Sequence, residues 1–343
     1  MSVTTERPGV YSSYTLSGRV RGTGSGTVVG LAAVSAAEDL PDVAAVTSQE
    51  EAETVFGAAS AMAALCRVLL LNGAPEVRCA AVDAGADTQD YAAAFALLAL
   101  EEDVGLVVCD SQDTDVHAAL QESIETAGEN SKYRMGIVEV QGNAAALTAA
   151  AEDLNSERMV LVGPCTETAG AAAAAVCGAL AGEADPALPL NGARLYGLGQ
   201  LSWAVQESQV TGLIQDGVTL LERTGGAICV VRGVTTRTTT NGAADATWRE
   251  ITTVRIVDDV IPSIRQALRA QFSRSKNTLQ TRGAIRTQVI VQLEDKLAKE
   301  IIDGYDNVTV EADAEDPTVC RVQFDFTVAH GLNQIYLTAH ITV

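Results

Sequence analysis

The feature that most constrains the fold of this chain is an alternation of short apolar segments and helical segments between Thr27 and Leu198. Because parallel strands need a crossover connection, which is usually a helix, this order predicts a mainly parallel sheet covered by helices on both faces. Apolar segments with the length of buried strands occur at 27–33, 76–82, 105–109, 135–140, 159–163 and 194–198. Segments with helical periodicity lie between them, at 50–72, 90–100, 116–127, 144–154 and 166–181.

In the last third of the chain, the pattern changes to a mixture of hairpins and helices. Gly225-Gly226 separates two apolar segments, 218–223 and 227–234, and therefore predicts a β-hairpin. Asp258 and Asp259 are expected to cap a helix that follows them. The predicted fold class is α/β plus α+β. The remaining predicted elements are a strand at 248–256, helices at 260–273 and 282–300, and strands at 307–312 and 319–328.

The last segment of the sequence has the pattern of a strand. Apolar and polar residues alternate from Val322 to Val328, and again from Leu332 to Val343, which is typical of strands with one buried face. Such a strand needs partners for its backbone N–H and C=O groups, and these come either from the same domain or from another subunit. The apolar face of the second segment consists of Ile335, Leu337, Ala339, Ile341 and Val343.

The first residues of the chain are expected to form an extended arm, because they are β-prone but contain too few apolar side chains for a core. The glycines at 22–26 precede a predicted strand instead of following one, so they fit a linker better than a dinucleotide-binding loop. The expected organisation is an N-terminal arm at 1–20, a β/α domain at 21–199, an α+β domain at 200–330 and a C-terminal strand or arm at 331–343.

The composition indicates a folded protein that binds no nucleic acid and does not insert into a membrane. Hydrophobic residues make up 47% of the chain, and the formal net charge of -21 opposes contact with phosphates. No apolar run approaches the roughly 18 residues of a membrane span. We see no signal peptide, so synthesis in the cytoplasm is expected. Seven cysteines without a C-x-x-C pair predict buried free thiols in place of disulfides or a zinc site.

The basic residues are concentrated in one part of the sequence. Ten of the 23 lie between Arg249 and Lys299, whereas the preceding β/α part is dominated by Asp and Glu. This concentration fits either solvated helix faces or a surface that meets an acidic partner.

Acidic turns after the predicted strands are the best candidates for a catalytic or metal site. Ligands bind at the carboxyl ends of strands in open α/β sheets, so Asp110, Asp113 and Asp115 could form the metal site of an α/β enzyme. We favour helix capping by these residues, because His117 is the only histidine nearby and no phosphate-binding loop accompanies them. No G-x-S-x-G, P-loop or H-E-x-x-H motif occurs. We therefore assign no catalytic residue, no cofactor and no metal.

Several short motifs occur in a specific order and spacing. They are Arg7-Pro-Gly-Val-Tyr11, Asp216-Gly-Val-Thr-Leu-Leu221, Ala227-Ile-Cys-Val-Val-Arg-Gly-Val-Thr-Thr236, Trp248-Arg-Glu-Ile-Thr-Thr-Val-Arg-Ile-Val-Asp258, Lys276-Asn277 with Thr281-Arg-Gly-Ala-Ile285, and Val322–Val328 with Leu332-Asn-Gln-Ile-Tyr336. Together they resemble the tail sheath proteins of contractile phage tails and related contractile injection systems, including phage-tail-like bacteriocins. The β/α part agrees with that family in architecture only, and looks like its subtilisin-like domain.

The resemblance implies a structural protein without enzymatic activity. It implies hexameric rings that stack helically around an inner tail tube and contract to drive the tube through a target cell envelope. The implied partners are further copies of the chain, the tube protein, the baseplate and the tail terminator. The implied location is a virion or phage-tail-like particle that is assembled in a bacterial host.

Two hypotheses about residues accompany the resemblance. The first is that the terminal segments add strands to neighbouring subunits, and the second is that basic side chains contact an acidic tube. The arm residues are Val10, Tyr11, Tyr14, Leu16, Ile335, Leu337, Ile341 and Val343, and the tube-contact residues are Arg265, Arg269, Arg274 and Lys276.

Overall fold

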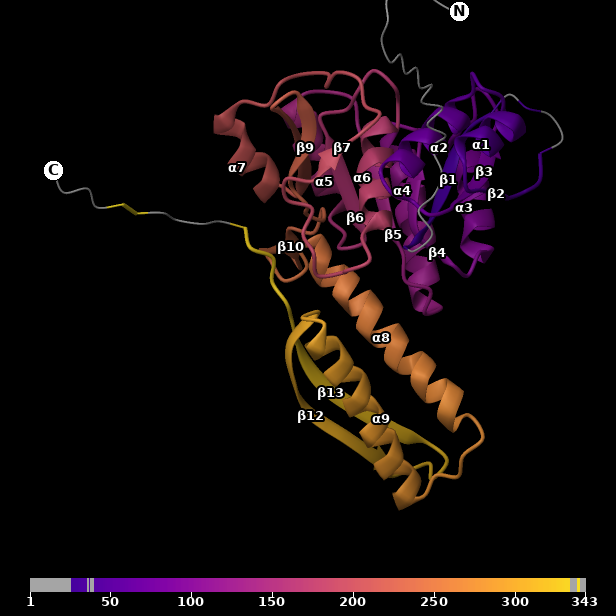
Figure 1. Cartoon of the computed structure of the whole chain (residues 1–343), viewed down its shortest axis with the longest axis vertical. Coiled ribbons are helices and arrows are strands. Elements are labelled where there is room, and N and C mark those ends of the chain that lie inside the picture. Colours follow the sequence, from indigo (N-terminus) through magenta and orange to yellow (C-terminus); the bar gives the residue numbers. More distant parts are fainter. Residues whose placement is uncertain (1–25, 36, 38–39, 334–337, 340–343) are drawn as a thin grey trace, which may run out of the picture.

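The computed structural model describes residues 26–35, 37, 40–333 and 338–339, and shows a large sheet unit followed by a smaller unit (Figure 1). The large sheet has nine strands in the order β2-β3-β1-β4-β5-β6-β8-β9-β7. Its central strands are parallel, which confirms the mainly parallel sheet. At the edges, β2 runs antiparallel to β3, β9 runs antiparallel to β8, and β7 runs antiparallel to β9. The strands are β1 (Val28–Val34), β2 (Ala44–Val46), β3 (Val77–Val82), β4 (Val104–Cys109), β5 (Met135–Glu139), β6 (Met159–Gly163), β7 (Arg194–Leu195), β8 (Val218–Thr224) and β9 (Ala227–Arg232).

Helices cover both faces of this sheet, as expected for parallel strands. The core on one face is formed with α1, α2 and α6, and the core on the other with α3, α4, α5 and α7. The single helix expected at 50–72 is in fact two, because α1 ends at Gly57, which has φ 83°, and a new helix begins after the cap Ser60. The helices are α1 (Gln49–Phe56), α2 (Ala61–Leu71), α3 (Thr88–Leu100), α4 (Thr114–Glu129), α5 (Ala144–Leu154), α6 (Ala171–Gly182) and α7 (Glu207–Gln215).

Helix α6 is buried on nearly all sides because its side chains are small. The four residues from Ala172 to Ala175 have no exposed surface. A Cβ atom at Gly178 would lie only 2.5 Å from the backbone oxygen of Leu69 in α2. Small residues therefore allow α2 and α6 to pack closely against each other, which buries α6 between its neighbours and the sheet.

The predicted β-hairpin is confirmed as β8 and β9, but it belongs to the large sheet, where β8 runs parallel to β6. The smaller unit follows it and contains two long helices packed on an antiparallel strand pair. A two-residue ladder, β10 (Thr239–Thr240) with β11 (Ala243–Ala244), lies in the connection between the units. The elements of the smaller unit are α8 (Ile251–Phe272), α9 (Leu279–Ala298), β12 (Ile302–Ala312) and β13 (Cys320–Val328).

The prediction of a strand at 248–256 is wrong, because this segment begins helix α8. Its β-branched residues favour a strand locally, but burial of one helical face overrides that preference. Ile251 and Val254 lie in a core of the large sheet, whereas Val260 and Ile264 lie in the core of the smaller unit. Asp258 and Asp259 therefore lie within the helix and do not cap it. One continuous helix joins the two cores (Figure 1).

We predict that Ile256→Ala lowers the free energy of unfolding by about 2–5 kcal/mol, because Ile256 is fully buried in the core that α8 shares with α9. Guanidinium denaturation followed by circular dichroism measures this change. The matched control is Gln266→Ala, which is exposed on the same helix and should change stability by less than about 0.5 kcal/mol. If the two variants were equally stable, α8 would not be buried in a core that it shares with α9.

Candidate functional site

Helix α8 is joined to the large sheet unit by a half-buried ion pair. The guanidinium of Arg158, which stands just before β6, donates two hydrogen bonds to the carboxylate of Asp258, and the Nη2–Oδ1 distance is 2.9 Å. The side chains of Arg158 and Asp258 are 18% and 19% exposed. Burial raises the pKa of Asp258, and the charge of Arg158 opposes that rise. The pair therefore fixes the middle of α8 against the sheet.

Tyr133 adds a second contact at the same place. The guanidinium carbons of Arg158 and Arg265 lie 5.2 and 5.5 Å from the centre of its ring, within the range of cation–π attraction. Arg265 Nη2 also donates a hydrogen bond to the Tyr133 hydroxyl over 3.1 Å. Arg265, expected at the tube, thus contacts the large unit of its own chain.

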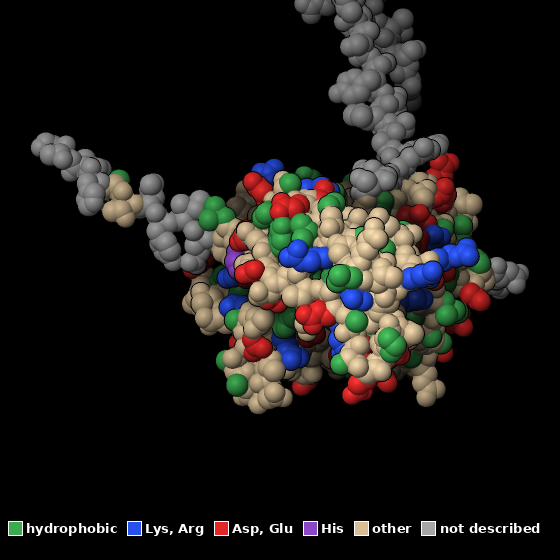
Figure 2. Space-filling model, turned by 90° about the horizontal axis from the view of Figure 1, so that it is seen from below, with side chains coloured by type: hydrophobic (Ala, Val, Ile, Leu, Met, Phe, Trp, Pro, Cys, Tyr) green, Lys and Arg blue, Asp and Glu red, His purple; other side chains and the backbone are tan. Residues whose placement is uncertain are grey.

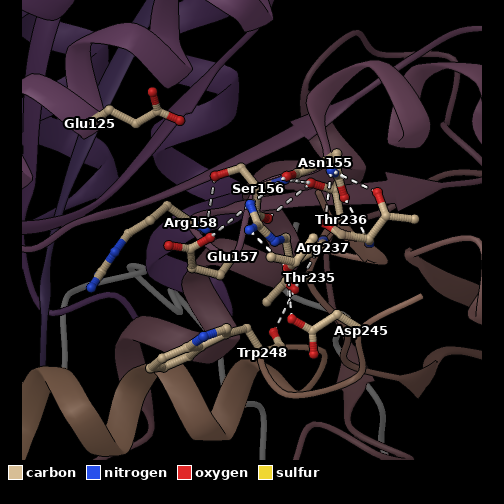
Figure 3. Close-up of polar contacts among 12 residues, drawn as sticks. Glu125, Asn155, Ser156, Glu157, Arg158, Thr235, Thr236, Arg237, Asp245 and Trp248 are labelled. Atoms are coloured by element: carbon tan, nitrogen blue, oxygen red, sulfur yellow. Dashed lines mark hydrogen bonds and ion pairs between the residues drawn. The ribbon is translucent and has the colours of Figure 1, made fainter. Parts of the chain in front are cut away.

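The connection between β9 and α8 is held by a polar network on the turn after α5 (Figure 3). Asn155, which has φ 33°, accepts hydrogen bonds from the backbone N–H groups of Thr238 and Thr239. Ser156 and Thr236 bond reciprocally, since the backbone N–H of Ser156 donates to Thr236 Oγ1, which donates to the carbonyl of Ser156. These bonds position the segment that leads into α8, so the orientation of α8 depends on more than the ion pair.

The strand pair of the smaller unit has one covered face and two open edges. Val322, Phe324, Phe326 and Val328 alternate toward the core beneath α8 and α9, whereas the residues between them are exposed. Within the described ranges, β12 and β13 pair only with each other. Each strand therefore has an outer edge without a neighbouring strand in the described residues, and such an edge is a template for a further strand.

The chain leaves the strand pair at a fixed point. The backbone N–H of Ala329 donates to the carbonyl of Ile301 over 3.3 Å, and Asn191 Nδ2 donates to Asn333 Oδ1 over 2.7 Å. A Cβ atom at Gly331 would lie 2.9 Å from Pro189 Cγ, so the backbone passes close to the large unit there. The segment beyond residue 333 therefore starts at the junction of the two units.

The residues predicted to contact the tube and those predicted to form the arms lie in different parts of the chain. Arg269, Arg274 and Lys276 are exposed in the last turn of α8 and in the turn after it, and Arg269 lies one helical turn beyond Arg265. Leu332 is 72% exposed and, with Asn333, has no secondary structure. The predicted arm residues lie outside the described residues, namely Val10, Tyr11, Tyr14, Leu16, Ile335, Leu337, Ile341 and Val343.

Asp110 and Asp113, two residues of the alternative acidic metal site, are engaged in other contacts. Asp110 is buried and accepts hydrogen bonds from the Tyr91 hydroxyl over 2.6 Å and from the backbone N–H of Val34 over 2.8 Å. Asp113 caps α4 by accepting from the N–H of Asp115 over 3.0 Å, as the capping interpretation predicted. In the described part of the chain, no three His, Cys, Asp or Glu side chains are grouped to hold a metal ion.

His117 does not form a catalytic pair with these carboxylates. Its ring Nε2 lies 2.9 Å from the backbone oxygen of Ser111, and burial lowers the pKa of the ring. Glu139, buried nearby, accepts hydrogen bonds from the backbone N–H groups of Gly170 and Ala173 at the start of α6. These groups at the carboxyl ends of the strands therefore stabilise the fold.

Comparison with known proteins identifies the family. Residues 84–236 match the phage tail sheath protein central domain, and residues 243–342 match the phage tail sheath C-terminal domain. The chain belongs to the phage tail sheath family. It is therefore a structural tail sheath protein of a phage or phage-tail-like particle, and not an enzyme. No helix in the described residues is long and apolar enough to cross a membrane.

Individual relatives agree with this assignment. The tail sheath protein of Bacillus phage SP01 is 29% identical over 170 residues, which are 49% of this chain and 28% of that protein, so the chain spans little more than a quarter of its relative. A chain of the anti-feeding prophage baseplate has a TM-score of 0.76 at 18% identity, with 99% of this chain and all of that chain covered. A chain of the contracted helical sheath of the same prophage has a TM-score of 0.71 at 16% identity, with 98% and 99% covered. Both structures share the fold of this chain.

We predict that Asp258→Asn destabilises the protein by about 1–3 kcal/mol, because it leaves the half-buried guanidinium of Arg158 without its counter-charge. Urea denaturation measures the loss, and in an Arg158→Met background the loss should shrink because the guanidinium is absent. Asp295→Asn is the control, since its ion pair with Lys299 is exposed to solvent and the substitution should cost much less stability. If the losses of stability caused by Asp258→Asn and Arg158→Met simply added in the double variant, the two side chains would not stabilise each other.

Proposed function

We propose that this chain forms hexameric rings that stack helically around an inner tail tube, and that shortening of the sheath drives the tube through a target envelope. The observation that carries the proposal is the strand pair β12–β13 with two open edges in the described residues, in a chain whose terminal segments have strand-like patterns. Family membership supports the same interpretation.

The open edges provide the means by which neighbours are joined. We assign the residues 10–16 of one neighbour and 332–343 of another to the outer edges of β12 and β13. Each backbone hydrogen bond contributes only about 0.5–1.5 kcal/mol net, so one added strand is weak. Many such strands repeated through a lattice hold it together through avidity, and each subunit can turn without leaving its neighbours.

The junction at α8 supplies the stiffness that such a movement needs. The helix is buried in two cores and is held by Arg158 and Tyr133, so the two units of one subunit move as one body. The change of shape then occurs between subunits, in the segments outside residues 26 and 333. The ends of the sheath meet the baseplate and the tail terminator.

The tube contact is assigned to Arg269, Arg274 and Lys276. These side chains are exposed, and none has an ion pair within the described part of the chain. Figure 2, which views the molecule from below, shows Lys and Arg side chains dispersed among Asp and Glu. The contact with an acidic tube therefore depends on separate charges, and not on one continuous basic patch.

We predict that deleting residues 332–343 leaves a folded, soluble subunit that forms no sheath in negative-stain electron microscopy. The reason is that the deleted segment supplies the strand for a neighbour, whereas the described core of the subunit does not depend on it. A control with Thr338→Ser and Thr342→Ser keeps the strand and should assemble. Normal sheaths from the deletion would refute strand exchange at this end.

We predict that changing Arg269, Arg274 and Lys276 together to Glu weakens binding of the sheath to its tube and leaves the fold intact, because all three are exposed. Co-sedimentation with assembled tubes at low and high salt measures this effect, which salt should reduce. The matched control reverses Arg67, Arg194 and Arg223, three exposed arginines of the large unit. Equal tube binding by the two triple variants would argue against the assignment.

A further inference from the structure

Two buried cysteine thiols in the large unit lie in contact with each other. The Sγ atoms of Cys66 and Cys79 are 3.4 Å apart, and the two residues are 0% and 1% exposed. All seven cysteines are free thiols, but no other two cysteine sulfurs are in contact within the described part of the chain. Cys66 and Cys79 therefore differ from the remaining cysteines in having a possible bonding partner.

Regular secondary structure fixes the positions of the two sulfurs. Cys66 lies in the middle of α2, and Cys79 lies on β3, which pairs with β1 on one side and with β2 on the other. Both side chains belong to the hydrophobic core on the same face of the sheet. A thiol pair held by a helix and a strand stays together in the folded protein, so the contact does not depend on the conformation of a loop.

The two sulfurs are close enough to become bonded. A disulfide has an S–S distance of about 2.05 Å, so the sulfurs of Cys66 and Cys79 need to approach each other by about 1.4 Å. An approach of this size is within the range of rotation about the two Cα–Cβ bonds. The backbones of α2 and β3 can therefore keep their places when the bond forms.

Burial keeps the pair reduced while the protein is made. The thiolate is the form of cysteine that reacts with oxidants. Burial raises the pKa of the Cys79 thiol well above its usual range, and the neighbouring sulfur of Cys66 raises it further. The cytoplasm is also a reducing compartment. The pair therefore reacts slowly, when the core beneath α2 opens locally.

We propose that Cys66 and Cys79 form a disulfide once the particle has left the reducing cytoplasm, with a peroxide as the oxidant. One thiol sulfur attacks the O–O bond of hydrogen peroxide, which gives a sulfenic acid and one water. The second thiol sulfur attacks the sulfenic sulfur, which forms the S–S bond, breaks the S–O bond and releases a second water. Two thiols and one hydrogen peroxide thus give one disulfide and two waters.

The disulfide stabilises the large unit near one edge of its sheet. It ties α2 to β3, and β3 lies beside the edge strand β2. Because the bond closes the loop from residue 66 to residue 79, it restricts the unfolded chain and raises the melting temperature by roughly 5 °C. The inference rests on the proposed function only in placing the particle outside the cell. The reaction takes place in an isolated subunit, so it can fail while the proposed function holds.

Oxidation of the folded, full-length subunit tests the proposal. The partly exposed Cys229 and Cys320 are first replaced by Ser, so that they form no bonds between chains. The protein is incubated with hydrogen peroxide, freed of the oxidant, unfolded with an alkylating reagent that blocks the remaining thiols, and digested with trypsin without a reductant.

Mass spectrometry of the digest identifies the bond. Trypsin cleaves after Arg67 and after Arg78, so Cys66 and Cys79 lie on separate peptides that only a disulfide keeps together. We expect these two peptides to be linked after peroxide treatment and to separate on reduction. The oxidised subunit should also melt at the higher temperature, and reduction after unfolding and refolding should restore the original one.

Two matched variants show which sulfurs react. Cys79→Ala should abolish the link and the rise in melting temperature, whereas Cys177→Ala, which removes another buried thiol of the same core, should keep both. A link that persists in the Cys79→Ala protein would assign the bond to Cys109, which lies on the same tryptic peptide, and would overturn the proposal. Alkylated Cys66 and Cys79 after peroxide treatment of the folded subunit would overturn it without any variant at these positions.

Discussion

The burial of helix α8 in two hydrophobic cores holds the large sheet unit and the smaller unit together. Its first turn is packed with the large sheet, and its middle is packed with α9 and the strand pair. A rotation of one unit relative to the other would expose Ile256 and Val260 and would separate Arg158 from Asp258. Because both changes are unfavourable, the two units resist rotation relative to each other.

The open edges of β12 and β13 can support ordered assembly only because the junction at α8 fixes their orientation. An exposed edge on a freely rotating unit would pair with any available strand, which is the usual origin of aggregation. Here α8 fixes the direction of β12 and β13, and Asn191 fixes the point at which the chain leaves them. The edges and the exit point therefore have a defined relation, and strand exchange can build a regular lattice.

The large sheet could be predicted from the sequence because apolar strands and helices alternate with little ambiguity, and Asp87 and Asp113 cap the helices that follow them. The start of α8 could not be predicted from the sequence. Ile251, Thr252 and Val254 favour a strand locally, but they become helical because their side chains are buried. The ion pair between Arg158 and Asp258 joins residues 100 positions apart, so no local pattern indicates it. The contact between Arg265 and Tyr133 likewise joins residues that are far apart in the sequence, so only the fold brings them together.

We propose that the outer edges of β12 and β13 receive strands from other subunits. This strand exchange would be visible in an electron cryomicroscopy reconstruction of the assembled sheath at a resolution that separates strands. We expect a four-stranded sheet in which the added strands are continuous with residue 26 of one neighbour and residue 333 of another. Bare edges, or edges covered by the terminal segments of the same chain, would contradict it.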